Sequence, residues 1–333
     1  MSHDLRVTTN PAERLLQLPS RLESATDFAE VIASLKSGHG ATLDGVWGSS
    51  RALVTAALAE HVPSTLVVVL PEAAEIDGYL DDLEMFSTAA AVSFPPQETA
   101  PGDEAFGDEA SGQRLRLLKQ LASGTQPPVV VTSIQSLLQR LPTPAELTGS
   151  TRTLRVGESL DLDAFVRWLL KRGFTNMTAV ELPGEFSHRG GILDLYAIDW
   201  EAPVRIELFD DEIESLRQFD VAHQRSLATL DEVDVTVVNR AEPLDHLTSY
   251  LPRDAWFLMV EPHDIDEAGK AFLNRAEDLQ YYHSTTAVMK EILRFPSATA
   301  ASVAADSLEA TCRLKIESVE RFSGEIGRVR DEL

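Results

Sequence analysis

The sequence lacks several features that would assign it at once to a class of protein. It holds a single cysteine, Cys312, which excludes an intramolecular disulfide and favours a reducing compartment. It contains no apolar run of the roughly 18 residues that a membrane-spanning helix needs, and its first twenty residues have no signal-peptide core. We therefore expect a cytoplasmic protein without a membrane partner.

Basic residues are also scarce. The chain has 29 Lys and Arg against 53 Asp and Glu, which gives a net charge of −24. Neutralising phosphate groups requires clustered Lys and Arg, so nucleic acid is not expected to be the main direct ligand. Hydrophobic residues make up 44% of the 333 residues. This length and composition predict two or three globular domains.

Motifs for catalysis and metal binding are missing. The eight histidines show no HExxH spacing, no CxxC accompanies them, and there is no GxSxG segment. The acidic cluster Asp210, Asp211 and Glu212 is interpreted as a hairpin turn, because Asp favours turns. We accordingly predict no catalytic residue, no metal and no cofactor.

Alternating strands and helices are the main pattern that is present. Apolar runs ended by turn residues predict strands, and amphipathic stretches predict helices. A helical region at 11–37 is expected to break at Pro19 and Ser20. This alternation predicts an α/β domain with a mostly parallel sheet. The predicted strands are 41–47, 65–70, 90–94, 129–131 and 255–260, and the predicted helices are 52–61, 73–86, 110–123, 132–140, 264–279, 285–295 and 314–329.

The pattern changes in the middle of the chain. A helix is predicted at 160–172, and short strands separated by turn residues continue to residue 238. We interpret this part as an inserted α+β domain. The predicted division is a first α/β part at 1–150, the insert at 151–240 and a second α/β part at 241–333.

Residues 45–52 resemble a P-loop that has lost its chemistry. The Walker A pattern GxxxxGK[ST] begins at Gly45 and has a further glycine at Gly48, but its second required glycine is Ser50. Arg51 replaces the phosphate-binding lysine, and Ala52 replaces the hydroxyl that would bind Mg²⁺. Weak or absent ATP turnover is predicted. A chance strand–turn–helix with two glycines is an alternative explanation of the segment.

Residues 184–220 are the most informative stretch of the chain. Within it, residues 204–209 alternate between an apolar set and a set that combines charge with an aromatic ring. Period-two alternation places the two sets on opposite faces of a strand. Arg and exposed aromatic side chains dominate binding hot spots, so the second face predicts a docking surface. The apolar set is Val204, Ile206 and Leu208, and the second set is Arg205, Glu207 and Phe209.

Several of these stretches resemble one known family. Residues 94–101 with 111–115, 130–140, 184–196 and 205–224 are similar to the N-terminal UvrB-like module of the transcription-repair coupling factors (Mfd). The similarity is clear over about residues 90–230. The resemblance implies a helicase-like, P-loop-type α/β domain with a degenerate nucleotide site, interrupted by an inserted α+β domain that binds UvrA.

The resemblance also implies a function and a set of contact residues. The module would recruit UvrA to stalled transcription complexes in nucleotide excision repair, without being an enzyme itself. The family's UvrA-contacting positions fall on Arg189, Arg205 and Phe209, with Glu207 at the rim, and Arg189 is expected at the start of the neighbouring strand. Full-length relatives reach RNA polymerase and DNA through further domains, including an ATP-driven motor. No motor motif occurs in these 333 residues, so either a fragment or a product that lacks the motor is expected.

Two other functions stay open on the sequence. One is a UvrB-like nucleotide-dependent protein that binds damaged DNA. UvrB has an intact P-loop and a long aromatic hairpin that clamps DNA, whereas residues 101–111 are too few for that hairpin and offer only Phe106. The other is an unrelated acidic α/β enzyme, for which no set of catalytic residues is found.

Overall fold

A computed structural model describes residues 14–97, 109–237, 244–304 and 309–316. The described chain combines helices with a seven-stranded parallel sheet, a six-stranded sheet and two separate pairs of strands. The predicted α/β class with a parallel sheet is confirmed. Phe106 and the short loop around it, like most of the helix predicted at 314–329, lie outside the described residues.

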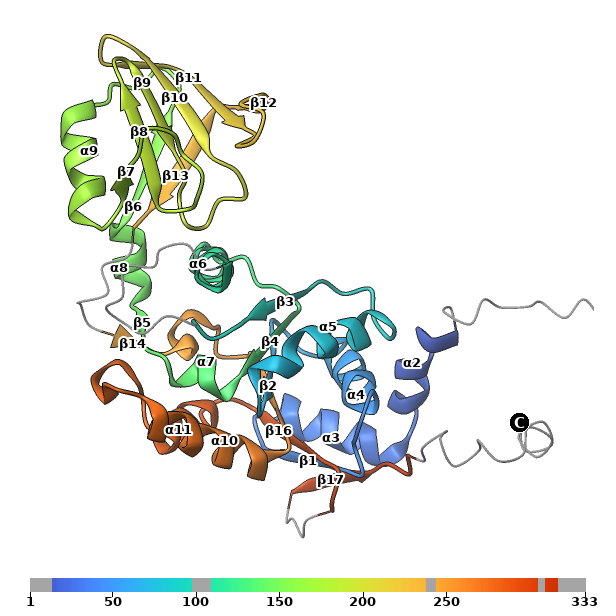
Figure 1. Cartoon of the computed structure of the whole chain (residues 1–333). Helices are drawn as coiled ribbons and strands as arrows, with labels where there is room; N and C mark the ends of the chain where they lie inside the picture. Colours follow the sequence, from blue (N-terminus) through green and yellow to red (C-terminus); the bar gives the residue numbers. More distant parts are fainter. Residues whose placement is uncertain (1–13, 98–108, 238–243, 305–308, 317–333) are drawn as a thin grey trace, which may run out of the picture.

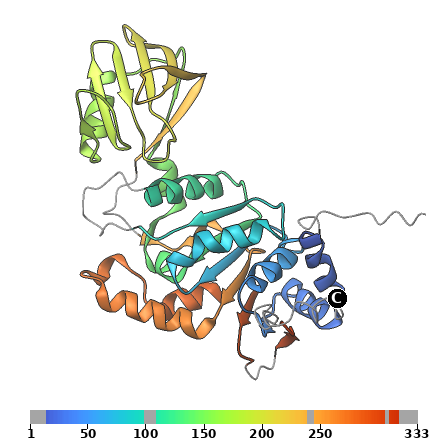
Figure 2. The same cartoon turned by 45° about the vertical axis from the view of Figure 1, so that its right-hand side comes forward.

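The parallel sheet is built from seven strands whose spatial order differs from their order in the chain. Two of its inner strands, at 66–70 and 129–133, are rich in Val and Leu because helices cover both faces of the sheet, as Figure 2 shows. In spatial order the strands are β17 (Ala310–Arg313), β1 (Ala41–Asp44), β16 (Ser297–Ala301), β15 (Trp256–Val260), β2 (Leu66–Leu70), β4 (Val129–Ser133) and β3 (Ala91–Phe94).

Two groups of helices cover the two faces of this sheet. One group is α3 (Thr26–Lys36), α4 (Ser50–Ala59) and α5 (Ile76–Glu84), whose apolar side chains share a core with β1 and β2. The other group packs on the opposite face and comprises α6 (Glu109–Ala122), α7 (Ile134–Leu138), α10 (Pro262–Arg275) and α11 (Thr285–Ile292). Three 3₁₀ turns complete this half, at Ala73–Glu75, Leu247–Tyr250 and Leu279–Tyr281.

The structure corrects the expected break near the N-terminal end of the described chain. A turn at Leu16 and Gln17 precedes helix α2 (Leu18–Glu23), Pro19 lies in the first turn of that helix, and a second break follows at Ser24 and Ala25 before α3. A proline is tolerated in the first helical turn because its missing N–H has no partner there in any case. Pro19 therefore starts a helix and does not end one.

The middle of the chain forms a separate layer. A six-stranded sheet, antiparallel except between β7 and β8, shares a core with helix α9 (Leu162–Lys171) and with the paired strands β6 (Thr151–Arg155) and β13 (Glu232–Thr236). In Figure 1 this part stands apart from the parallel sheet. In spatial order its strands are β12 (Ser226–Leu230), β11 (Glu212–Phe219), β10 (Val204–Phe209), β9 (Ile192–Leu195), β8 (Glu185–Arg189) and β7 (Thr175–Asn176).

Short connections join the two halves. The chain leaves the parallel sheet through β5 (Leu141–Pro142) and α8 (Pro144–Gly149), and it returns through β14 (Leu244–Asp245), which pairs with β5. A capping box between Thr143 and Glu146 fixes the start of α8. A second contact links the halves, because Lys119 Nζ on α6 lies 2.7 Å from a carboxylate oxygen of the buried Asp199.

Candidate interaction face

The alternation predicted for residues 204–209 is present in β10. Val204 and Ile206 are 2% and 0% exposed and lie in the core of the six-stranded sheet, and Leu208 packs against that core. Arg205, Glu207 and Phe209 lie at the alternate positions of the same strand. We call the solvent-facing side of β8, β9, β10 and β11 the interaction face.

Phe209 is the most exposed aromatic group on this face. Its side chain is 77% exposed at the end of β10, just before the turn that leads to β11. The backbone beside it is fixed, because the N–H of Leu208 donates to the carbonyl of Gly191 at 2.7 Å. A Cβ atom at Gly191 would lie 2.7 Å from the carbonyl oxygen of Leu208, so only glycine permits this close approach of the two strands. The ring of Phe209 is thus held out on a rigid strand end.

Arg205 is tied to the neighbouring strand. Its Nε donates to Oδ1 of Asp194 at 2.7 Å, and its Nη2 donates to Oδ2 of the same carboxylate at 2.8 Å. These hydrogen bonds raise the pKa of Arg205 above its ordinary value. The two residues are direct partners across β9 and β10. Arg205 therefore presents a guanidinium in one fixed orientation.

Glu207 is paired on the other side of β10. Its carboxylate accepts a 2.6 Å hydrogen bond from the hydroxyl of Ser215 and lies 3.1 Å from Nη2 of Arg217, both on β11. Its charge is partly balanced within the face, as expected of a residue at the rim of an interface.

Arg189 lies elsewhere than the sequence suggested. It is the last residue of β8, not the first of a strand, and β9 separates it from β10. The register pairs Arg189 with Ile192, and Ile192 with Glu207, so all three share one row across the sheet. Two strand spacings amount to about 10 Å. The guanidinium of Arg189 donates to the backbone carbonyl of Thr178, a neutral group that does not balance the positive charge of the arginine.

The structure adds three residues to the interaction face that the sequence reading did not select. Ile192 is 41% exposed, Asp194 holds Arg205, and Arg217 holds Glu207. The alternation in Ile192-Leu193-Asp194-Leu195, with both leucines buried, was the available signal for the first two. Their partners became known only from the strand register.

The acidic cluster after Phe209 forms a turn. Asp210 adopts φ 60° between β10 and β11, and the hydroxyl of Ser159 donates to the carboxylate of Asp211. Asp tolerates this left-handed backbone region better than most residues. Within the described residues, no group of three or more His, Cys, Asp or Glu is arranged to hold a metal ion.

The segment after strand β1 is closed by hydrogen bonds between Ser50 and Trp47. Gly45 and Gly48 adopt positive φ angles of 73° and 55°, and helix α4 begins at Ser50. The hydroxyl of Ser50 donates to the carbonyl of Trp47 at 2.6 Å and accepts from the N–H of Trp47 at 2.9 Å. A backbone N–H that a phosphate would need is thereby occupied. Ala52 is 1% exposed and packs in the core.

Arg51 is surrounded by acidic groups. Its guanidinium lies 3.1 Å from a carboxylate oxygen of Glu75 and 3.5 Å from one of Glu261. A cavity of about 510 Å³ opens beside it and contains five carboxylates but only this arginine among its charged lining groups: Glu72, Glu75, Glu261, Asp264 and Glu267. Such a cavity repels the phosphates of a nucleotide.

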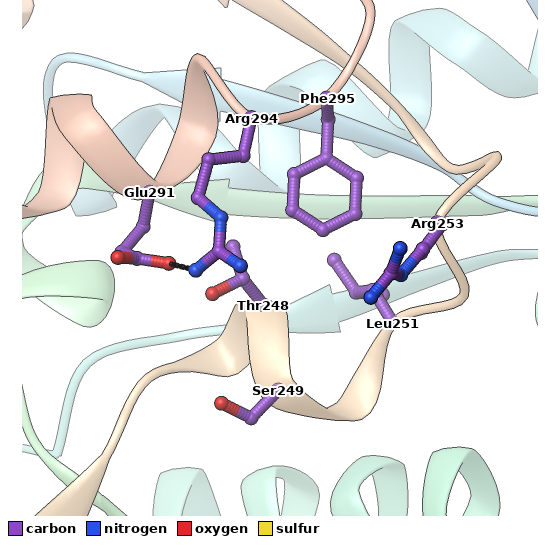
Figure 3. Close-up of a pocket in the computed structure, with 7 residues that line it drawn as sticks. All are labelled: Thr248, Ser249, Leu251, Arg253, Glu291, Arg294 and Phe295. Carbon is purple, nitrogen blue, oxygen red and sulfur yellow. Dashed lines mark hydrogen bonds and ion pairs between the residues drawn. The ribbon is translucent and has the colours of Figure 1, made fainter.

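A second cavity lies at the other end of the strands of the parallel sheet, next to the residues that precede β15 and β16. Its volume is about 350 Å³, and Figure 3 shows Arg294 and Arg253 on either side of the ring of Phe295. Arg294 is paired with Glu291 at 2.7 Å. None of the residues selected from the sequence lines this cavity.

No described helix is long and apolar enough to cross a membrane.

Comparison with known proteins identifies relatives of this chain. Residues 153–240 match the family model of the UvrB interaction domain. The transcription-repair-coupling factor of Bacillus subtilis is 32% identical over 218 residues, which is 64% of this chain and 18% of that protein. Those of Myxococcus xanthus and Mycobacterium bovis are 32% identical over 65% of the chain and 39% identical over 55% of it.

The matched part of the chain covers between 15% and 19% of the length of these three relatives. The family model covers the part of the chain in which the interaction face lies. They confirm the resemblance seen in the sequence: the chain is similar to part of the transcription-repair-coupling factors, and residues 153–240 are similar to the UvrB interaction domain.

Proposed function

We propose that this chain serves transcription-coupled nucleotide excision repair in the cytoplasm by docking UvrA on the interaction face. The contact residues are Arg189, Arg205 and Phe209, with Glu207 at the rim. The observation that carries the proposal is that these four side chains lie on one face of one sheet, within a region similar to the UvrB interaction domain. The name of the matched relatives supplies the repair process.

The chemistry of the face suits a protein partner. Phe209 offers apolar area to a partner. Because its side chain is 77% exposed, it contributes little to the packing of the core. Arg189 and Arg205 offer guanidinium donors to carboxylates or carbonyls of a partner. The ion pairs with Asp194 and Glu207 keep the face from becoming a uniformly basic patch. A mixed face of this kind favours specificity over non-specific attraction.

We propose further that the α/β half is not catalytic and supports the docking part. The segment at 151–240 would be the inserted UvrA-binding domain, flanked by the two parts of one α/β domain at 1–150 and 241–333. The internal hydrogen bonds of Ser50 and the five carboxylates around Arg51 support a degenerate nucleotide site. RNA polymerase and DNA would be reached through other regions of a longer protein.

Calorimetric titration of UvrA tests the docking assignment. Phe209→Ala is expected to weaken binding by about 1–3 kcal/mol, and Arg205→Glu to weaken it at least as much because it reverses the charge. Leu279→Ala is the control, since Leu279 is also an exposed apolar residue, at 60%, but lies in the α/β half. Unchanged affinity for both Phe209→Ala and Arg205→Glu would overturn the assignment.

A further inference from the structure

The guanidinium of Arg205 is held by three side chains, Asp194 and Phe219 of the six-stranded sheet and Gln224 of the turn between β11 and β12. Asp194 accepts from Nε and Nη2 in a two-point contact, and Oε1 of Gln224 lies 3.3 Å from Nη2. The ring of Phe219 lies under the guanidinium, with its centroid 5.0 Å from the central carbon. These bonds use Nε and Nη2, so the remaining terminal nitrogen, Nη1, is the one oriented for a further acceptor.

Asp194 is the strongest of these supports and is poorly placed to contact a partner itself. Its side chain is 16% exposed, against 31% for Arg205. Both carboxylate oxygens already accept from Arg205. A two-point contact between planar groups fixes the orientation of an arginine side chain, which otherwise has many rotamers.

We infer that Asp194 is the positioning residue of the docking surface and that it acts through Arg205. The inference rests on the proposed function, in which Arg205 contacts UvrA. Immobilising a long side chain on binding lowers affinity, and a side chain that is already fixed avoids this loss. Asp194 thus prepares Arg205 for binding before the partner arrives.

Asp194 could instead weaken UvrA binding, and the direction of the affinity change on removing it distinguishes the two effects. A carboxylate beside Arg205 cancels part of its charge and competes with an acidic partner for the same donors. If competition dominated, removing Asp194 would tighten UvrA binding. If positioning dominates, removal weakens it.

A double-mutant cycle measured by calorimetry with UvrA decides between these effects. Asp194→Ala is expected to weaken binding about threefold to tenfold, the range set by immobilising one long side chain, and Asp194→Asn to weaken it less because one acceptor oxygen remains. In the Arg205→Ala background, Asp194→Ala should have no further effect. Thermal unfolding of each variant separates lost docking from lost folding, and Asp194→Asn serves if Asp194→Ala unfolds.

Asp234→Ala is the matched control. It removes the same charge from β13, where the carboxylate accepts a 2.6 Å hydrogen bond from Thr153 outside the interaction face. Its UvrA affinity should equal that of the wild-type chain. Unchanged or tighter binding by Asp194→Ala and Asp194→Asn, together with weaker binding by Arg205→Ala, would overturn the inference alone. Full affinity of Arg205→Ala would overturn the inference and the place of Arg205 in the proposed function together.

Discussion

Arg51 and Arg205 show how similar ion pairs lead to different outcomes in the two halves of the molecule. Each arginine lies beside carboxylates at close distance, 3.1 Å for Arg51 and Glu75 and 2.7 Å for Arg205 and Asp194. Arg51 borders a cavity with five carboxylates, so its charge is outweighed. Arg205 stands on an open sheet face near Arg189 and the exposed ring of Phe209.

The difference lies in the surroundings of each arginine and not in the pair itself. At the start of α4, Ser50 and Trp47 satisfy each other, and Arg51 is turned toward Glu75 and Glu261. On the interaction face, the side chains that fix Arg205 come from β9 and from the turn after β11, and they bind its Nε and Nη2. A charged residue therefore indicates binding only when its local partners leave a donor and room for a ligand.

The largest expected effect tests whether the two halves are independent. Phe165 on α9 is fully buried in the core beneath the interaction face and stacks on Trp168 with centroids 5.5 Å apart. Phe165→Ala should cost about 3–5 kcal/mol of stability in that half, because it leaves a cavity. Hydrogen exchange should show lost protection in β10 and retained protection in β2.

Val54→Ala is the corresponding change in the other half, since Val54 is fully buried on α4. It should lower protection in β2 and spare β10. Equal losses of hydrogen-exchange protection in β2 and β10 for either variant would show that the two halves unfold as one unit.

A smaller effect separates the halves by their response to acid. Burial, with the neighbouring His283 as a smaller cause, lowers the pKa of His246 from its ordinary 6.5 to about 4. Between these values the unfolded chain binds a proton that the folded chain does not, so stability falls as the pH drops below about 6.5. The expected loss from this group is about 2 kcal/mol at pH 5.

Urea unfolding at pH 7 and pH 5 measures this loss, with His246→Asn as the comparison. The asparagine oxygen can replace Nδ1 of His246, which accepts from the N–H of Thr248, but it does not titrate. The variant should lose less stability than the wild-type chain over this interval. An identical loss in both would show that His246 is not the group responsible. Hydrogen exchange at pH 5 should show the weakening in the parallel sheet first.

The smallest effect concerns nucleotide binding. Arg51→Ala should leave ATP affinity and turnover at the background of the wild-type chain, because Arg51 is already bound to Glu75 and Glu261. Its stability should change by less than about 1 kcal/mol, as for other partly exposed ion pairs. ATPase activity in the wild-type chain that disappears in Arg51→Ala would contradict the comparison between the two arginines.

The sequence predicted five of the seven strands of the parallel sheet, the apolar runs most clearly, and missed β16 and β17. The runs at β2, β4 and β15 consist largely of Val, Leu, Trp, Phe and Met, and their burial on both faces made them recognisable. Strand β16 reads Ser-Ala-Thr-Ala-Ala, and β17 reads Ala-Thr-Cys-Arg. Small residues give no periodic signal, so these two strands are recognised only from their pairing, β17 with β1 and β16 with both β1 and β15.

The candidate site divided in a similar way. The alternation of residues 204–209 placed Arg205, Glu207 and Phe209 on one face, since a strand permits only two side-chain directions. The position of Arg189 was wrong, because nothing in the local sequence shows that β9 lies between β8 and β10. The partners Asp194, Ser215 and Arg217 follow from register, which depends on how the whole sheet packs on its core.

Local pattern alone thus determined the α/β class, the buried strands and the two faces of β10, because each depends on the period of side chains along a few residues. The tertiary structure decided which charges meet. It brought Glu75 and Glu261 to Arg51 from two other segments, and it set Asp194 beside Arg205 by pairing two antiparallel strands. Ion pairs between distant residues depend on the path of the chain in space, and that path is fixed by packing of the entire core.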